Sequence, residues 1–219
     1  MPRIMRGLAD GAIYHVINRG NGKQKVFHED SDYRAFIRLL HDALSRYEVK
    51  LYAYCLMPNH FHLLVTPETA ADLSKMMQWL MTSHVRRYHR HYDTSGHVWQ
   101  GRFKSFIVKN DTHFLTVARY IEANPVRAGL VPAALEWEWS SHAERVGGKS
   151  EFISEFPLSL PDDWSDFVNV ALTENELEKL RQSVNRQAPY GEEQWQLEIC
   201  KKLGLESTLK SRGRPKKIK

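Results

Sequence analysis

The stretch that decides the fold is Leu51-Tyr52-Ala53-Tyr54-Cys55-Leu56-Met57-Pro58-Asn59-His60-Phe61-His62-Leu63-Leu64-Val65. Two runs of apolar and aromatic residues, 51–56 and 60–65, flank the turn signal Pro58-Asn59, and this pattern predicts a β-hairpin that ends near Pro67. Side chains alternate along a strand, so His60 and His62 project from one face while Phe61 points into the opposite layer. The hairpin thus predicts two imidazoles side by side on one face of a sheet.

Strand and helix signals alternate on both sides of this hairpin. Helical segments are recognised by apolar stripes, and strands by β-branched and aromatic runs that end at turn residues. The expected order is a strand at 12–19, a helix at 30–47, the hairpin, a helix at 71–92, a strand at 102–109 and a helix at 111–123. This order predicts an α+β fold, an antiparallel sheet with helices packed on one face. The third helix is expected to stop at Asn124-Pro125, because a proline disfavours helical backbone at the residue before it.

The last third of the chain has a weaker pattern. A linker is expected at 147–150, followed by two short helices at 174–185 and 191–203. Residues 201–219 carry eight Lys or Arg and one acidic residue, which is typical of a tail that is disordered when free. We therefore expect a main domain at 1–146, a helical extension at 147–205 and a basic tail at 206–219.

Composition excludes several classes of protein. The 219 residues are 42% hydrophobic, which is too apolar for a wholly disordered chain, and 31 Lys and Arg against 26 Asp and Glu give a net charge of +5. No secretory h-region follows the first residues and no long apolar run occurs, so we expect a cytoplasmic protein without a membrane partner. Cys55 and Cys200 are far apart, which favours neither a disulfide framework nor a structural zinc site.

The paired histidines and one helix carry the candidate chemistry. Imidazoles of His60 and His62 suit a divalent transition metal, which would need at least one further ligand. Tyr120 and Asn124 are four residues apart, so they share one stripe of the third helix, at the margin of its apolar side. Taken singly, each pattern is equally compatible with surface-strand histidines and with a tyrosine that only packs.

Four blocks in sequence order are far more specific than any of these patterns alone. They are Tyr14-His15-Val16-Ile17-Asn18-Arg19-Gly20, Met57 to Val65, Trp99-Gln100-Gly101-Arg102-Phe103-Lys104-Ser105, and Arg119-Tyr120-Ile121-Glu122-Ala123-Asn124-Pro125-Val126-Arg127-Ala128-Gly129-Leu130. Together they resemble the REP-associated tyrosine transposases, which are relatives of the single-tyrosine HUH transposases. The resemblance covers about residues 10–146 and implies a ferredoxin-like or RRM-like HUH nuclease fold.

The resemblance also implies a reaction. In such enzymes a tyrosine hydroxyl attacks single-stranded DNA at a hairpin of the REP type, leaving a 5′-phosphotyrosine and a free 3′-OH. Carried over to this chain, Tyr120 is the nucleophile, His60 and His62 hold Mg²⁺ or Mn²⁺, and Asn124 is the third ligand. The REP-associated branch is compatible with a monomer, whereas insertion-sequence relatives act as dimers.

Basic residues near these blocks are candidate phosphate contacts, although each could equally belong to a solvated face. They are Arg19, Lys23, Arg102, Lys104, Arg119, Arg127, and, in the tail, Arg212 and Arg214. Arg212-Gly213-Arg214-Pro215 resembles the core of an AT-hook, and a generic basic tail is an equal alternative.

Two other functions compete with a transposase. A catalytically silent protein that binds structured nucleic acid would share the fold, but His60, His62 and Tyr120 are all intact. A histidine-triad nucleotide hydrolase would need another histidine where this chain has Leu64, and it would not explain the block around Tyr120.

Overall fold

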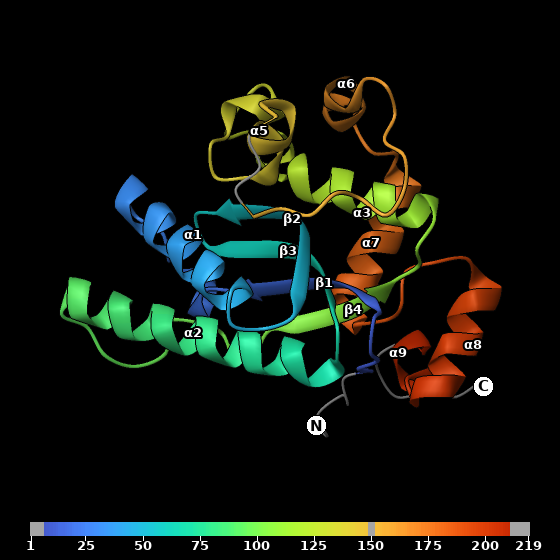
Figure 1. Cartoon of the computed structure of the whole chain (residues 1–219), viewed down its shortest axis with the longest axis horizontal. Coiled ribbons are helices and arrows are strands. Elements are labelled where there is room, and N and C mark those ends of the chain that lie inside the picture. Colours follow the sequence, from blue (N-terminus) through green and yellow to red (C-terminus); the bar gives the residue numbers. More distant parts are fainter. Residues whose placement is uncertain (1–6, 149–151, 211–219) are drawn as a thin grey trace, which may run out of the picture.

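A computed structural model describes residues 7–148 and 152–210. Its centre is one four-stranded antiparallel sheet with strand order β2-β3-β1-β4 (Figure 1). The strands are β1 (Ile13–Arg19), β2 (Val49–Met57), β3 (His60–Pro67) and β4 (Lys104–Val108). Helix α1 (Asp30–Leu44) follows β1, and α2 (Ala70–Tyr92) follows β3, so the first half has the βαββαβ order of ferredoxin-like folds. The predicted α+β class and antiparallel sheet are confirmed.

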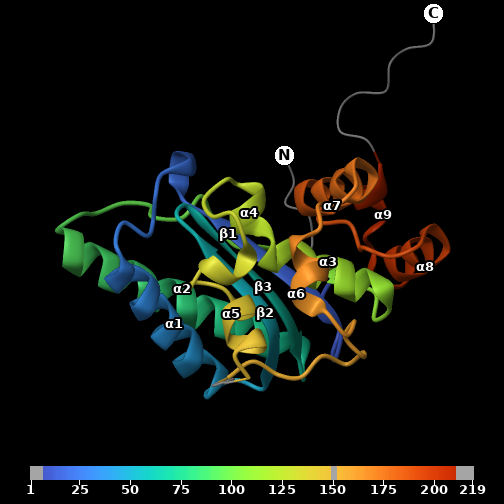
Figure 2. The same ribbon diagram turned by 90° about the horizontal axis from the view of Figure 1, so that it is seen from above.

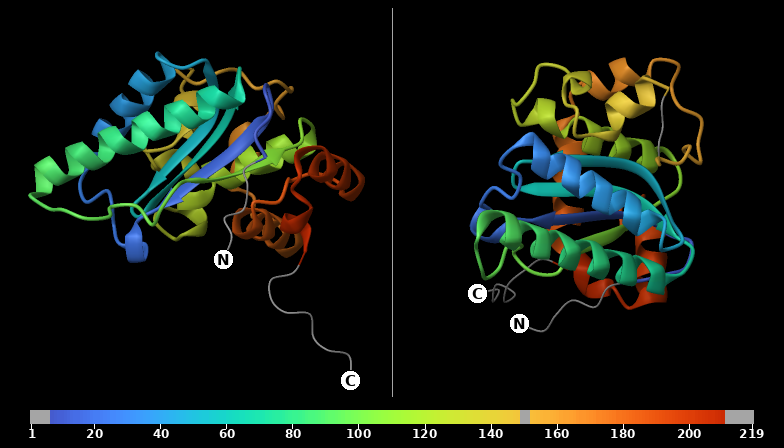
Figure 3. Two further views of the ribbon diagram at one scale, coloured as in Figure 1. Left: turned by 90° about the horizontal axis from the view of Figure 1, so that it is seen from below. Right: turned by 60° about the vertical axis from the view of Figure 1, so that its left-hand side comes forward.

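The hairpin forms as the sequence predicts, and both faces of its strands are covered. Alternate residues such as Phe61 pack into a core beneath α1 and α2, beside Phe36 and Trp99. Figure 3 shows these two helices side by side across one face of the sheet. Helix α2 begins with a capping box in which Thr69 and Asp72 bond each other's backbone N–H groups, so its start is fixed locally.

The second face of the sheet is covered as well, which corrects the expectation that helices pack on one face only. Figure 2 shows α1 and α2 on one side of the strands and later helices on the other. A second apolar core there includes Leu64, Phe114, Trp164 and Leu180, contributed by the sheet and by three helices. These helices are α3 (Thr112–Glu122), α6 (Trp164–Asn169) and α7 (Glu174–Arg186). The strands carry apolar residues on both faces, so a single layer of helices would leave one face wet.

Short elements complete the described part of the chain. They are η1 (Asn21–Lys23), α4 (Asn124–Arg127), η2 (Ala134–Glu136), α5 (Ser141–Val146), α8 (Glu193–Leu203) and α9 (Glu206–Leu209). The expectation of non-helical backbone at Asn124 is wrong, because Pro125 lies in the first turn of α4, where its missing N–H is not needed. Helix α4 therefore continues from the end of α3 with one intervening residue, Ala123.

The C-terminal region packs against the sheet. Tyr190 pairs with the edge strand β4: its N–H donates to Ile107 O at 2.7 Å, and its carbonyl accepts from Lys109 N–H at 2.9 Å. The division of the chain at residue 147 stays a prediction, since this packing joins the extension to the sheet. In the described residues, no helix is both long and apolar enough to cross a bilayer.

Candidate active site

The four residues predicted to carry the chemistry line one cavity of about 330 Å³. His60 and His62 come from β3, Tyr120 from α3, and Asn124 from α4. The cavity opens on the second face of the sheet, where α3 crosses the strands. Residues separated by 58 positions in the sequence, His62 and Tyr120, have ring centroids only 5.8 Å apart.

The two histidines lie on one face of β3, as the alternation predicts. Their ring centroids are 4.9 Å apart, and His62 is buried while His60 is half-buried. Phe61, between them, is wholly buried in the opposite core, and this fixes the rotation of the strand. The core residue thus helps to hold both imidazoles toward the cavity.

Each imidazole has its Nδ1 engaged by a neighbour. His62 Nδ1 lies 2.8 Å from Nε2 of His15, and His60 Nδ1 lies 2.6 Å from Oδ1 of Asn59. Asn59 Oδ1 can only accept, so His60 Nδ1 carries the proton and its Nε2 keeps a lone pair. His62 Nε2 is buried and has no hydrogen-bond partner among the described residues. Buried polar atoms seldom lack a partner, so this arrangement fits a pair of Nε2 metal ligands.

The electrostatics of the cavity keep both imidazoles neutral. Burial, reinforced by the charges of Arg19 and Arg127, lowers the pKa of His60 to about 3. Burial also lowers the pKa of His62 well below its usual range, with smaller contributions from His60 and His15. A histidine ligates a metal only in its neutral form, so these shifts favour ligation at neutral pH.

Arg127 organises the other wall of the cavity. Its guanidinium carbon lies 4.5 Å from the centroid of the Tyr120 ring, and its Nη2 donates to Oδ1 of Asn124. Asn124 in turn donates from Nδ2 to the Tyr120 carbonyl at 3.0 Å. Both polar atoms of the Asn124 amide are therefore engaged within the chain. Its oxygen is available to a metal only when Arg127 takes another acceptor.

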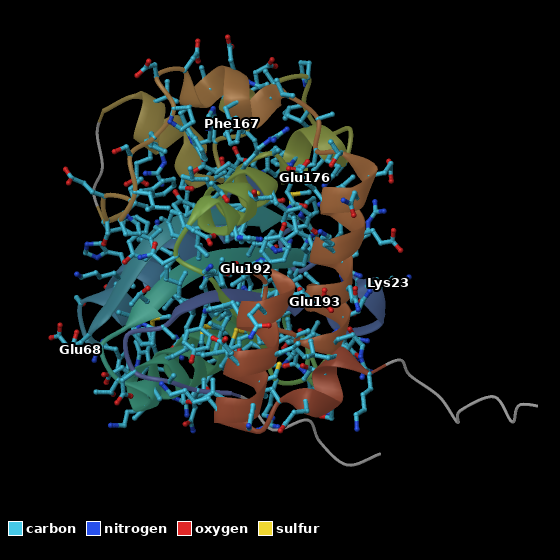
Figure 4. All side chains as sticks on the ribbon, turned by 90° about the vertical axis from the view of Figure 1, so that its right-hand side faces the viewer. Lys23, Glu68, Phe167, Glu176, Glu192 and Glu193 are labelled. Atoms are coloured by element: carbon cyan, nitrogen blue, oxygen red, sulfur yellow. The ribbon has the colours of Figure 1, made fainter. Side chains whose placement is uncertain are left out.

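The predicted phosphate contacts fall into separate groups. Arg19 and Arg127 line the cavity, and Arg19 also lines a neighbouring hollow with Arg102 and Lys104. Lys23 is exposed in η1 and does not line the cavity (labelled in Figure 4).

Arg119 is a correction. It is buried, donates to the carbonyls of Val170 and Ala171, and lies over the ring of Phe167, so it fastens α3 to the extension instead of facing a strand of DNA. Arg212 and Arg214 lie outside the described residues.

A second cluster of possible metal ligands lies elsewhere. Asp111, His113 and Glu192 come close together in the described chain. Nζ of Lys109 already forms ion pairs with Asp111 and Glu192, so the cluster has its own cation. The sequence prediction places the metal at His60 and His62, not here.

Sequence reasoning missed two contributors to the site. His15 lies on β1, whose pairing with β3 sets Ile17 opposite His62, so His15 projects from the same face as the paired histidines. Its ring stacks on that of His62 with centroids 5.0 Å apart. Arg181 of α7 also lines the cavity. Alternation along β1 could have indicated the face of His15, but nothing local to Arg181 indicates that α7 reaches the site.

Comparisons with known proteins give the class of this protein. The family described as "Transposase IS200 like" matches residues 9–124, which is more than half of the chain. The chain therefore belongs to the IS200-like transposases.

Particular relatives carry narrower names. One from Haemophilus influenzae (strain ATCC 51907 / DSM 11121 / KW20 / Rd), named "Putative REP-associated tyrosine transposase", is 29% identical over 131 residues, which are 55% of this chain and 69% of the relative. A "REP-associated tyrosine transposase" from Escherichia coli (strain K12) is 26% identical over 117 residues, covering 52% of this chain and 64% of the relative.

The fold is also similar to that of a solved structure, a REP-associated tyrosine transposase bound to a REP hairpin. The TM-score is 0.57 at 18% identity, over 74% of this chain and 98% of the other. At that identity the similarity establishes the fold, and the expected fold class agrees with it.

Proposed function

We propose that this protein is a metal-dependent endonuclease and strand transferase that acts on single-stranded DNA at REP-type hairpins through a 5′-phosphotyrosine intermediate. The observation that carries the proposal is the convergence of His60, His62 and Tyr120 on one cavity, with Nε2 of His62 buried and without a partner in the described chain. The names of the relatives and the hairpin bound to the solved structure support the choice of substrate.

Tyr120 is the proposed nucleophile. Its hydroxyl oxygen would form the bond to phosphorus while the bond to the 3′ oxygen breaks, and the departing strand keeps a 3′-OH. The phosphodiester energy is then stored in the phosphotyrosine, so a later 3′-OH can rejoin DNA without ATP. The position of Tyr120, between α3 and the imidazoles, suits attack on a phosphate held in the cavity.

His60 and His62 would hold Mg²⁺ or Mn²⁺ through their Nε2 atoms. A bound divalent cation supplies polarisation of a non-bridging phosphate oxygen and charge stabilisation during attack. Asn124 is the proposed third ligand, and an incoming phosphate would give Arg127 the alternative acceptor that releases the Asn124 oxygen. None of the described residues that line the cavity is a carboxylate, so we expect phosphate oxygens to contribute to metal binding.

His15 is proposed as a positioning residue. When Nδ1 of His62 donates to Nε2 of His15, the lone pair of His62 stays on Nε2, facing the cavity. The stacking of the two rings fixes the same orientation.

A denaturing gel tests the chemistry. Labelled single-stranded DNA with a REP-type hairpin is incubated with Mn²⁺ and the wild-type protein, Tyr120→Phe, or Tyr190→Phe as a buried tyrosine outside the cavity. We expect a covalent adduct with wild type and Tyr190→Phe and none with Tyr120→Phe. Hairpin binding in a native gel without any adduct, over a panel of cleavage sequences, would instead support a catalytically silent binding protein.

A further inference from the structure

The catalytic cavity continues into a second hollow along β1. This hollow has a volume of about 190 Å³ and is lined by β1, by the loop before β4, and by α7. The two hollows share Ile17, Arg19, Val184 and Asn185, so they are adjacent parts of one groove. We call this the β1–α7 groove.

Helix α7 is held firmly as one wall of this groove. Leu177, Leu180 and Ser183 are buried against the sheet, and a capping box between Thr173 and Glu176 fixes the start of the helix. Arg186, in its last turn, donates to backbone carbonyls of the segment 207–208. Figure 4 shows α7 and α8, marked by Glu176 and Glu192, in front of the strands.

The charge of the groove has one sign. Arg181 and Arg127 line the catalytic end, and Arg102 and Lys104 line the other end, with Arg19 between them. Neither hollow has an aspartate or glutamate among its described lining residues. Arg181 and Asn185 are four residues apart on α7, so they face the groove from a single stripe.

We infer that the β1–α7 groove holds the single-stranded DNA next to the scissile phosphate, and that Arg181 contacts the phosphate backbone there. The inference rests on the proposed function and adds a contact from outside the family-matched residues 9–124. A groove of basic residues that follows the backbone is how proteins bind single strands, and the apolar side chains of Ile17 and Val184 suit sugars and unpaired bases. A duplex, with its phosphates on the outside of a stiff rod, fits hollows of this size poorly.

Binding of oligo(dT) tests the inference without requiring hairpin recognition. A labelled strand of about 12 nucleotides, within the usual site sizes for single-strand binders, is titrated by fluorescence anisotropy in metal-free buffer over a range of salt concentrations. The variants are Arg181→Ala, Arg181→Lys, and Lys179→Ala, an exposed cation of α7 that does not line the groove.

Losing one phosphate contact lowers the salt slope of single-strand binding by about 0.7, which corresponds to about fivefold weaker binding at 0.1 M salt when extrapolated from 1 M. We expect this loss for Arg181→Ala, retention of the slope in Arg181→Lys, and a much smaller change for Lys179→Ala. Equal effects of Arg181→Ala and Lys179→Ala would overturn the groove assignment. So would an equal loss on a duplex of the same length, or tighter binding of oligo(U) than of oligo(dT).

The adduct assay separates this inference from the proposed function. An adduct with wild type, together with unchanged binding by Arg181→Ala, overturns the groove alone. An Arg181-specific loss of binding without any adduct upholds the groove and overturns the chemistry.

Discussion

Glu122, two residues after Tyr120, is a buried carboxylate on which the position of α3 depends. It accepts hydrogen bonds from Ser141 Oγ at 2.7 Å, His142 Nδ1 at 3.0 Å and Trp164 Nε1 at 2.8 Å, and Arg145 Nε lies 3.4 Å away. These partners belong to α5 and α6, so one side chain joins three helices. Removing one partner of a buried ion pair generally costs about 3 to 5 kcal/mol, because the remaining charge is left uncompensated.

We therefore expect Glu122→Gln to lower the free energy of unfolding by about 3 to 5 kcal/mol, a large share of the usual stability of a domain. Urea unfolding followed by circular dichroism measures this change. Glu138→Gln, at an exposed position, is the matched control and should change the free energy by less than about 0.5 kcal/mol. A loss below about 1 kcal/mol for Glu122→Gln would refute the view that this network holds α3.

The same network predicts how stability depends on pH. Burial alone would raise the pKa of Glu122, but the hydrogen bonds from His142 and Ser141 and the charge of Arg145 outweigh burial, so the pKa is lower than usual. A depressed folded-state pKa stabilises the protein above the unfolded value, near 4.5, and this contribution is lost as pH falls through the folded value. The stability difference between wild type and Glu122→Gln should therefore shrink on acidification below about pH 4.5. A difference that stays constant with pH would contradict this assignment.

Other predictions concern the metal, the core and the tail. His62→Ala should abolish Mn²⁺ binding in calorimetry performed with a DNA strand present, and His15→Ala should weaken it by about 10-fold to 100-fold, with partial recovery in His15→Gln; unchanged affinity in His15→Ala would remove its positioning role. Phe61→Ala should lower the free energy of unfolding by about 3 to 5 kcal/mol, since Phe61 is wholly buried, and a loss below about 1 kcal/mol in urea would count against its part in the core. Removing residues 211–219, which include five Lys and Arg, should flatten the salt dependence of DNA binding, and an unchanged slope would show that the tail adds no phosphate contacts.

Local sequence patterns predicted the elements and the heart of the site. Alternation over 51–65 is enough for the hairpin and for the common face of His60 and His62, because a strand has a period of two residues. The four-residue spacing of Tyr120 and Asn124 likewise follows from the period of a helix, and it persists through Pro125 because α4 continues the turn.

Features that depend on long-range packing were not predictable in this way. Arg119 lies within the same block as Tyr120, yet its side chain faces Val170, some 50 residues later. The short helices α5 and α6 have caps at Ser140 and Asp163, but six residues are too few to show an apolar period. The contribution of α7 to the cavity depends on tertiary contacts that no local pattern encodes.

The double-sided burial of β3 also acts as a check on correct folding. A slip of one residue against β1 or β2 would turn Phe61 into the catalytic cavity and both imidazoles into the aromatic core beside Phe36 and Trp99. Such a chain would bury two unpaired polar rings and lose its hydrophobic anchor, so it would be unstable as well as unable to cut. Strand registration and the capacity to break DNA are therefore coupled, and only a correctly assembled copy carries the hazardous activity.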